Sequence, residues 1–319
     1  MQTVRINSYA KVNLTLEIVG EKEGYHLLDS LVASVDISDH ILVSKRRDKL
    51  SAVTMHGLGS ESIPPEKNNA LKAAEAFSRT FGVNGAEITV YKNIPMGAGL
   101  GGSSADVSGV LNGMAQLYGI TDRKKLKEIA DSLGSDTGYM LDGGFARMQG
   151  RGEIVTPIST GVKLHFLLLC PNSTVGAGEC YACYDKMPNE DKKGGGQTEK
   201  AIAALCKNDK NGLGRYLTND LFLPAAALNA DVKKAYEEAW SFSPLGVVMT
   251  GSGSCVMALF ETKELCEWAK SRYRGKCRAY VAQTLKPEYS PKPKNSGFFR
   301  NPFALTDEEE KLLDGINKE

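Results

Sequence analysis

The sequence predicts an α+β protein of two domains followed by a tail. Apolar residues alternate in strand-like runs in both halves of the 319-residue chain, and segments with helical periodicity separate these runs. A glycine-rich segment at residues 95–106 also lies between a predicted strand and a predicted helix. We expect the first domain at residues 1–157, the second at 158–286 and the tail at 287–319.

The first domain is expected to mix strands and helices. Its predicted elements, in chain order, are strands at 12–18 and 37–43, a helix at 70–77, a strand at 87–91, and helices at 107–114 and from 124 onward. Gly134 is a candidate C-cap for the last of these helices. Ser135 or Asp136 then begins the next segment, and Gly143-Gly144 leads into a hairpin-like stretch.

The glycine-rich segment has the composition of a phosphate-binding loop. Its glycines are Gly97, Gly99, Gly101 and Gly102. Glycine lets backbone N–H groups approach a ligand closely, and the N-terminus of the following helix carries partial positive charge. Together these features predict an anion site, with the phosphates of a nucleotide as the expected ligand. The alternative is a strand-to-helix turn that binds no ligand.

Two familiar nucleotide motifs do not fit this loop. Gly97-x-Gly99-x-x-Gly102 matches the dinucleotide fingerprint, which needs an acidic residue at the end of a second strand about twenty residues on. The candidate at that distance, Asp122, instead begins a helical pattern. A Walker A loop is excluded because Gly-x-x-x-x-Gly-Lys occurs nowhere in the sequence.

The second domain is expected to begin with a buried strand at 164–169, followed by helical patterns to about Trp240. A strand at 246–249 then precedes a second glycine turn, Gly251-Ser252-Gly253-Ser254, and an apolar run at 255–260. The alternative for this turn is a tight connection between strands without a ligand.

Two further segments are expected to lie outside the regular elements. The polar, glycine-rich stretch at 188–198 predicts a surface loop. Three prolines in the tail, Pro287, Pro291 and Pro293, argue against regular structure there. Thr306-x-x-Glu309 forms a capping box that predicts a short terminal helix.

Composition excludes several classes of function. A net charge of +1 gives no electrostatic reason to expect nucleic acid or membrane partners. No apolar signal core and no run of eighteen apolar residues occurs, so we expect a cytoplasmic protein. Seven cysteines are an odd number, which does not suggest a disulfide framework. Cys180-x-x-Cys183 stands alone, and we expect free thiols there rather than a zinc or redox site.

Three separated motifs resemble the signature of the GHMP kinases, a family of small-molecule kinases. They are Ala10-Lys11-Val12-Asn13-Leu14, the segment from Pro95 to Asp106, and Met249-Thr250-Gly251-Ser252-Gly253. This resemblance implies a ribosomal protein S5 domain 2-like N-terminal domain and a ferredoxin-like C-terminal domain. It also implies that ATP and Mg²⁺ are used with a small-molecule acceptor.

Four shorter segments resemble one subgroup of that family. They are Gly24-Tyr25-His26, Leu133-Gly134-Ser135-Asp136, Gly150-Arg151-Gly152-Glu153 and Asn219-Asp220-Leu221. The subgroup phosphorylates the 2-hydroxyl of a diphosphocytidyl sugar alcohol in non-mevalonate isoprenoid biosynthesis. The alternatives are a homoserine or mevalonate type of kinase, and a non-catalytic nucleotide-binding regulator on the same fold.

The resemblance implies catalytic roles for Lys11 and Asp136. A carboxylate beside the acceptor hydroxyl can orient it and accept its proton, and a nearby ammonium keeps that carboxylate ionised. The alternative for Asp136 is a helix N-cap, and the alternative for Lys11 is a solvent-facing strand residue. Since Ala10 and Val12 form the buried phase of the strand, Lys11 and Asn13 are expected to share the opposite face.

The resemblance also implies two groups of binding residues. Those expected at ATP are Pro95, Gly97, Ala98, Gly99, Leu100, Gly101, Gly102, Ser103 and Ser104, with one of the two serines expected at Mg²⁺. Those expected at the acceptor are Asn13, Tyr25, His26, Tyr181, Thr250 and Gly251. An aromatic face can stack on a pyrimidine, and an imidazole can bond the edge of the base. The alternatives are an amphipathic-helix aromatic for Tyr181 and a surface-loop histidine for His26.

Two positions depart from the family pattern. Tyr9 stands where a proline is usual, and Thr137-Gly138 follows Asp136 where Val-Pro is usual. The missing proline changes how rigidly Asp136 is presented. These departures bear more on the identity of the acceptor than on nucleotide binding.

Overall fold

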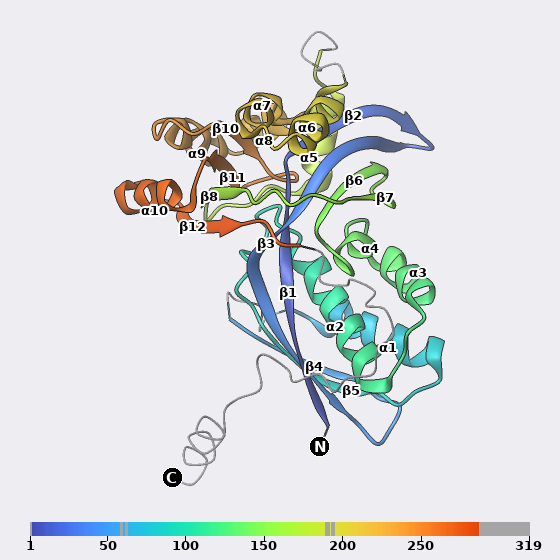
Figure 1. Ribbon diagram of the computed structural model, residues 1–319. Helices are drawn as coiled ribbons and strands as arrows, with labels where there is room; N and C mark the ends of the chain where they lie inside the picture. The colour runs from blue at the N-terminus through green and yellow to red at the C-terminus, as the bar shows by residue number, and fades with distance from the viewer. Residues whose placement is uncertain (1, 58–59, 61–62, 189–191, 193–194, 287–319) are drawn as a thin grey trace. The chain divides into compact units, whose positions relative to one another are not determined.

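The computed structural model describes residues 2–57, 60, 63–188, 192 and 195–286, which form two β-sheets with helices packed on them (Figure 1). The strands are β1 (Thr3–Asn13), β2 (Thr15–Lys22), β3 (Tyr25–Lys45), β4 (Ala52–His56), β5 (Ala86–Tyr91), β6 (Phe145–Gly150), β7 (Ile154–Ile158), β8 (His165–Cys170), β9 (Thr218–Asn219), β10 (Gly246–Met249), β11 (Val256–Phe260) and β12 (Arg278–Gln283). The helices are α1 (Asn69–Phe81), α2 (Gly102–Tyr118), α3 (Arg123–Leu133), α4 (Thr137–Met140), α5 (Ala177–Asp185), α6 (Gln197–Cys206), α7 (Lys210–Tyr216), α8 (Phe222–Leu228), α9 (Ala230–Trp240) and α10 (Lys263–Arg272).

The larger sheet is organised around β3, a strand of 21 residues that pairs with β1, β2, β5 and β6. Helix α2 packs against β1 and β3, and α1 and α3 pack around it (Figure 1). Two glycines allow this close packing. A Cβ atom at Gly109 would lie 2.5 Å from Ile41 Cδ1, and one at Gly113 would lie 2.6 Å from Val43 Cγ2. The helix face that carries these two glycines therefore determines how closely α2, and the glycine loop before it, can approach the sheet.

The smaller sheet is antiparallel, with strand order β10-β11-β8-β12, and α9 and α10 pack against it. The two sheets share one hydrophobic core, which contains Val12 and Leu31 from the larger sheet and Leu168 and Val248 from the smaller one. The short parallel pairing of β2 with β9 adds a backbone connection between the two parts. The two halves therefore form one continuous core.

The predicted strand at 12–18 is wrong in one respect: the chain bends at Leu14, which separates β1 from β2. The bend leaves the apolar alternation intact, so the periodicity could not reveal it. The polar residues between the apolar ones, Lys11, Asn13 and Glu17 among them, are also buried. Their side chains are engaged in hydrogen bonds or ion pairs, which satisfies them away from water.

Other predicted elements are confirmed with small shifts. The strand at 246–249 is β10, the helix after the glycine loop is α2, and Asp122 is the N-cap of α3. Gly134 does follow α3, but with φ near 169° it is extended rather than left-handed. The predicted strand at 37–43 is only part of β3, which begins at Tyr25.

The predicted loop at 188–198 lies partly outside the described residues, and its end is wrong because α6 begins at Gln197. The predicted tail structure from Pro287, including the capping box at Thr306, also lies outside the described residues.

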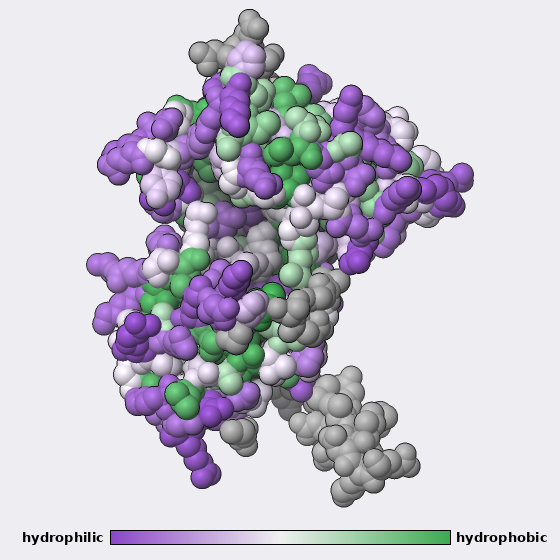
Figure 2. Space-filling model, turned by 180° about the vertical axis from the view of Figure 1, so that it is seen from behind, coloured by the Kyte–Doolittle hydropathy of each residue, from purple (hydrophilic) through white to green (hydrophobic). Residues whose placement is uncertain are grey.

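Seen from behind, the described surface is mostly hydrophilic, with hydrophobic residues in scattered groups (Figure 2). Within the described part of the chain, no helix is long and apolar enough to cross a bilayer. All seven cysteines are free thiols, as expected from their number. Burial raises the pKa of the Cys180 thiol to about 12, which keeps it protonated at neutral pH.

Candidate active site

The structure brings Lys11 and Asp136 together although 125 positions separate them. Lys11 Nζ lies 3.1 Å from Asp136 Oδ2 and donates a 2.7 Å hydrogen bond to Asn13 Oδ1. The Lys11 side chain is only 6% exposed, whereas the Asp136 side chain is 30% exposed. The ammonium is therefore fixed beneath a carboxylate that a ligand can reach.

Local backbone features present both groups. The register of β1 against β3 shifts between Tyr9 and Ala10, next to Lys11, as is common where a sheet presents a functional side chain. Asp136 occupies the N-cap position of the short helix α4, but its side chain accepts no capping hydrogen bond from that helix. Its carboxylate is directed at Lys11 instead.

Asn13 connects this pair to the second glycine turn. The backbone N–H of Asn13 donates to Thr250 Oγ1 at 2.9 Å, and the backbone N–H of Gly251 donates to Asn13 Oδ1 at 3.1 Å. Asn13 Nδ2 also donates to Ser30 Oγ at 2.8 Å. These hydrogen bonds hold the Asn13 side chain in one orientation, with its amide oxygen Oδ1 facing Lys11.

The glycine loop folds against the same turn with backbone conformations that favour glycine. Gly97, Gly99 and Gly101 all have positive φ. A Cβ atom at Gly99 would lie 2.2 Å from the backbone oxygen of Thr250. Helix α2 begins directly after Gly101, and no described side chain caps its first N–H groups, which remain available to an anion.

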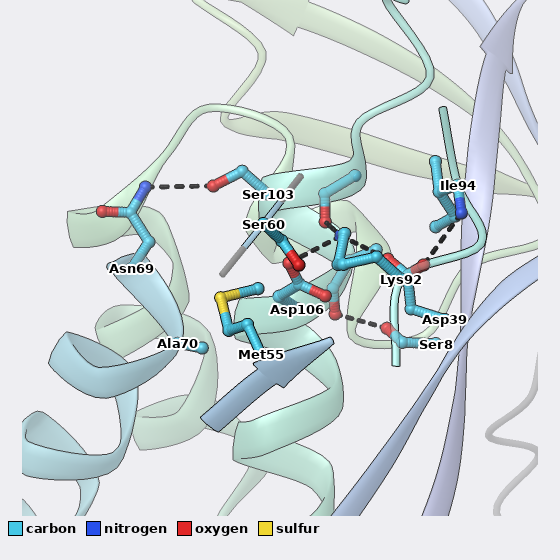
Figure 3. A network of polar contacts seen from close by, with 12 residues as sticks. Ser8, Asp39, Met55, Ser60, Asn69, Ala70, Lys92, Ile94, Ser103 and Asp106 are labelled. Atoms are coloured by element: carbon cyan, nitrogen blue, oxygen red, sulfur yellow. Dashed lines mark hydrogen bonds and ion pairs between the residues drawn. The ribbon is translucent and has the colours of Figure 1, made fainter. Parts of the chain in front are cut away.

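A cavity of about 280 Å³ follows this loop. Its lining contains every residue that the sequence predicted at ATP, together with Met96: Pro95, Met96, Gly97, Ala98, Gly99, Leu100, Gly101, Gly102, Ser103 and Ser104. The Ser103 hydroxyl accepts a 3.2 Å hydrogen bond from Asn69 Nδ2 (Figure 3). Lys92 and Asp106 also line the cavity, and the sequence assigned no role to either.

Lys92 lies between two buried carboxylates beneath the loop (Figure 3). Its ammonium contacts Asp39 and lies 2.7 Å from Asp106 Oδ2, and all three side chains are less than 8% exposed. Asp39 Oδ1 also accepts hydrogen bonds from the backbone N–H groups of Asn93 and Ile94, at the start of the loop. Burial raises the pKa of Asp106 to about 7, although Lys92 acts in the opposite direction.

A second, larger cavity of about 640 Å³ is lined by both Lys11 and Asp136. Its lining includes six residues that the sequence predicted at the acceptor or in catalysis: Lys11, Asn13, Tyr25, His26, Asp136 and Tyr181. Gly251 lines it as well, whereas Thr250 is fully buried behind Asn13. Gly99 and Gly101 line both cavities, so the two meet at the glycine loop.

Aromatic and charged side chains form the far end of this cavity. The ring of His26 stacks on Tyr181 with centroids 4.8 Å apart, and its Nε2 lies 2.7 Å from Asp185 Oδ1. The guanidinium of Arg151 lies 3.7 Å from the centre of the Tyr25 ring. Nothing in the local sequence pattern identifies Asp185 as a partner of His26, because 159 positions separate them.

Comparisons with known proteins agree with this arrangement. Residues 68–146 match the GHMP kinases N terminal domain, and residues 201–276 match the GHMP kinases C terminal domain. The two-domain fold is thus that of the GHMP kinase class. A solved homoserine kinase from Cytophaga hutchinsonii shares the fold, with a TM-score of 0.72 at 19% identity over 90% of this chain and 96% of its own.

More similar relatives narrow the class to one family. The 4-diphosphocytidyl-2-C-methyl-D-erythritol kinase of Carboxydothermus hydrogenoformans is 34% identical over 79% of this chain and 86% of its own length. The crystal structure of a 4-(cytidine 5'-diphospho)-2C-methyl-D-erythritol kinase has a TM-score of 0.73 at 28% identity, over 88% of this chain and 98% of its own. The chain belongs to the 4-diphosphocytidyl-2-C-methyl-D-erythritol kinase family.

Proposed function

We propose that this protein transfers the γ-phosphoryl group of ATP to the 2-hydroxyl of 4-diphosphocytidyl-2-C-methyl-D-erythritol. The observation that carries the proposal is the 3.1 Å contact between Lys11 and Asp136, in the cavity that meets the phosphate cavity at Gly99 and Gly101. One cavity has the backbone donors that a triphosphate needs, and the other has the aromatic side chains that a cytosine needs. The expected setting is the cytoplasm, with small molecules as partners.

Asp136 is the proposed catalytic carboxylate. It is exposed enough to meet the acceptor hydroxyl, whose proton it accepts as the phosphoryl group is transferred. Lys11, 3.1 Å from that carboxylate, stabilises the negative charge that develops on the attacking oxygen. The remaining contribution is positioning, because the N–H groups of the glycine loop hold the phosphates in line with that oxygen.

The residues present fit Mg²⁺ bound mainly through the phosphates of ATP. No group of three or more His, Cys, Asp or Glu side chains that could hold a metal occurs among the described residues. The hydroxyls of Ser103 and Ser104 line the phosphate cavity and are the proposed protein ligands. When bound, Mg²⁺ would neutralise charge on the transferred phosphoryl group.

An acceptor panel tests this proposal. Purified protein with ATP and Mg²⁺ should release ADP fastest with 4-diphosphocytidyl-2-C-methyl-D-erythritol. A higher rate with homoserine or mevalonate would replace the proposed acceptor. ATP binding without turnover on any acceptor would instead indicate a non-catalytic regulator.

A further inference from the structure

The backbone on either side of Asp136 has little rigidity of its own. Asp136 lies between Gly134 and Gly138, and glycine has more backbone freedom than any other residue. The helix that follows, α4, has only four residues, and the Asp136 side chain accepts no hydrogen bond from it. A further contact is therefore needed to keep the Asp136 carboxylate 3.1 Å from Lys11.

The side chain of Thr137 makes such a contact. Its hydroxyl donates a 2.7 Å hydrogen bond to the backbone oxygen of Gly134, and this oxygen also accepts a 3.2 Å hydrogen bond from the Thr137 N–H. Thr137 is only 1% exposed, so water has little access to it. The two hydrogen bonds close a turn over residues 134–137, and Asp136 is the third residue of this turn.

The same hydroxyl explains why residue 134 is a glycine. A φ near 169° is extended backbone that any residue can adopt, so the backbone conformation does not require glycine there. A Cβ atom at Gly134 would lie 2.8 Å from Thr137 Oγ1 and 3.6 Å from Ser104 Oγ, which lines the phosphate cavity. The missing side chain therefore leaves room for the Thr137 hydroxyl, and the closed turn borders the phosphate cavity.

We propose that Thr137 is a positioning residue, whose hydroxyl fixes the turn that presents the Asp136 carboxylate to the acceptor. This inference rests on the proposed function, since it assumes that Asp136 accepts the proton of the acceptor hydroxyl. Thr137 is buried and lines neither of the two cavities, so it acts through Asp136 and not on a substrate. The competing explanation is that the Thr137 hydroxyl only stabilises the fold around α4.

Thr137→Val removes the hydroxyl with little change of shape. Gly134 O keeps the hydrogen bond from the N–H of residue 137, so this carbonyl is not left unpaired and the variant should fold. We expect kcat to fall by about tenfold, which corresponds to one hydrogen bond, because Asp136 is then held less firmly against the acceptor hydroxyl. KM for ATP and KM for the acceptor should not change, because neither cavity loses a contact.

Thr137→Ser keeps the hydroxyl and should keep the wild-type kcat. Ser132→Ala is the matched control, because Ser132 Oγ donates a 2.7 Å hydrogen bond to the backbone oxygen of Ile129, three residues earlier. This control removes the same kind of bond outside the 134–137 turn, and kcat should not change. If Thr137→Val lowers stability but leaves kcat unchanged, or if Ser132→Ala lowers kcat equally, the inference is wrong.

Hydrogen exchange separates this inference from the proposed function, because it requires no turnover. In Thr137→Val, the amides of residues 134–140 should exchange about tenfold faster than in the wild type, while those of α3 should not change. If no acceptor is phosphorylated, faster exchange still supports the link between Thr137 and the Asp136 turn, and only the proposed function fails. Unchanged exchange in an active enzyme would overturn the inference.

Discussion

The two cavities beside Lys11 and Asp136 are built in different ways. The phosphate side is formed mainly by backbone, with three glycines at positive φ and the uncapped N-terminus of α2. The acceptor side is formed by side chains from β3, α5 and the turn after β6 that converge on one space. The backbone N–H groups of the phosphate side can bind the negative charge of any phosphate. The side chains of the acceptor side can distinguish one base from another. Specificity for the acceptor therefore depends on the cavity whose side chains come from distant segments of the chain.

Asp136 lines the acceptor cavity beside Lys11, and its replacement should have the largest effect. Asp136→Asn should lower kcat by about 10³-fold, because the amide cannot accept the proton of the acceptor hydroxyl. Binding of ATP and of the acceptor should change little, as measured by calorimetry. Asp131→Asn, at an exposed carboxylate paired with Lys127, is the control and should keep full activity. A nearly normal kcat in Asp136→Asn would show that the Lys11–Asp136 pair is not the catalytic centre.

Gly99→Ala tests whether the phosphate side depends on its backbone. The new Cβ atom would lie 2.2 Å from the Thr250 oxygen, so the loop must move away from the second glycine turn. This movement would misplace the backbone N–H groups that hold the phosphates. We therefore expect KM for ATP to rise by about 10²-fold, because a displacement of about 1 Å can cost that much.

Gly119→Ala is the matched control for this change. Gly119 has φ of +68°, close to the +76° of Gly99, but nothing lies within 4 Å of its Cβ position. Both variants should lose about 1 kcal/mol of stability from backbone strain, and only Gly99→Ala should lose ATP affinity. Similar ATP kinetics in the two variants would contradict a role for close approach.

Asp106→Asn tests the buried side chains under the phosphate loop. Burial raises the pKa of Asp106 to about 7 in the folded protein, above its value near 4 in the unfolded chain. The stability gained from its proton is present below pH 4 and is lost as the pH rises through 7. Between pH 5 and pH 8, the wild type should therefore lose about 2 kcal/mol relative to the non-titrating variant. Urea unfolding of both proteins at the two pH values measures this difference, and parallel pH profiles would contradict it.

Tyr25→Ala should have the smallest effect. Tyr25 is half-exposed and stacks on Arg151, so it offers one face at the rim of the acceptor cavity. Loss of one base–aromatic contact should raise KM for the acceptor by about tenfold, with kcat unchanged. Tyr91→Ala, at another half-exposed tyrosine outside both cavities, should leave KM unchanged. A fall in kcat would instead place Tyr25 near the reacting groups.

The sequence predicted the phosphate side better than the acceptor side for a physical reason. A glycine loop followed by a helix is a local pattern, so Gly97 to Gly102 could be assigned from consecutive residues. The shared face of Lys11 and Asn13 followed from strand periodicity and is observed as a hydrogen bond between them. The contact of Lys11 with Asp136 depended on the resemblance to a family, because periodicity gives no information on distant contacts.

Long-range partners were missed for the same reason. Asp185 meets His26 only because α5 packs beside the beginning of β3, and no spacing in the sequence reports that packing. Lys92 was assigned no role from the sequence, although it is buried between Asp39 and Asp106. The bend at Leu14 could not be predicted, because the apolar residues of the sequence alternate in the same way on both sides of it.

The length of β3 has a consequence for how damage to the sheet would spread. This one strand carries His26 near its beginning and Asp39, which anchors the start of the glycine loop, thirteen residues later. A slip of one residue in the register of β3 would turn both side chains to the opposite face of the sheet. A single error of strand pairing would therefore alter both cavities together.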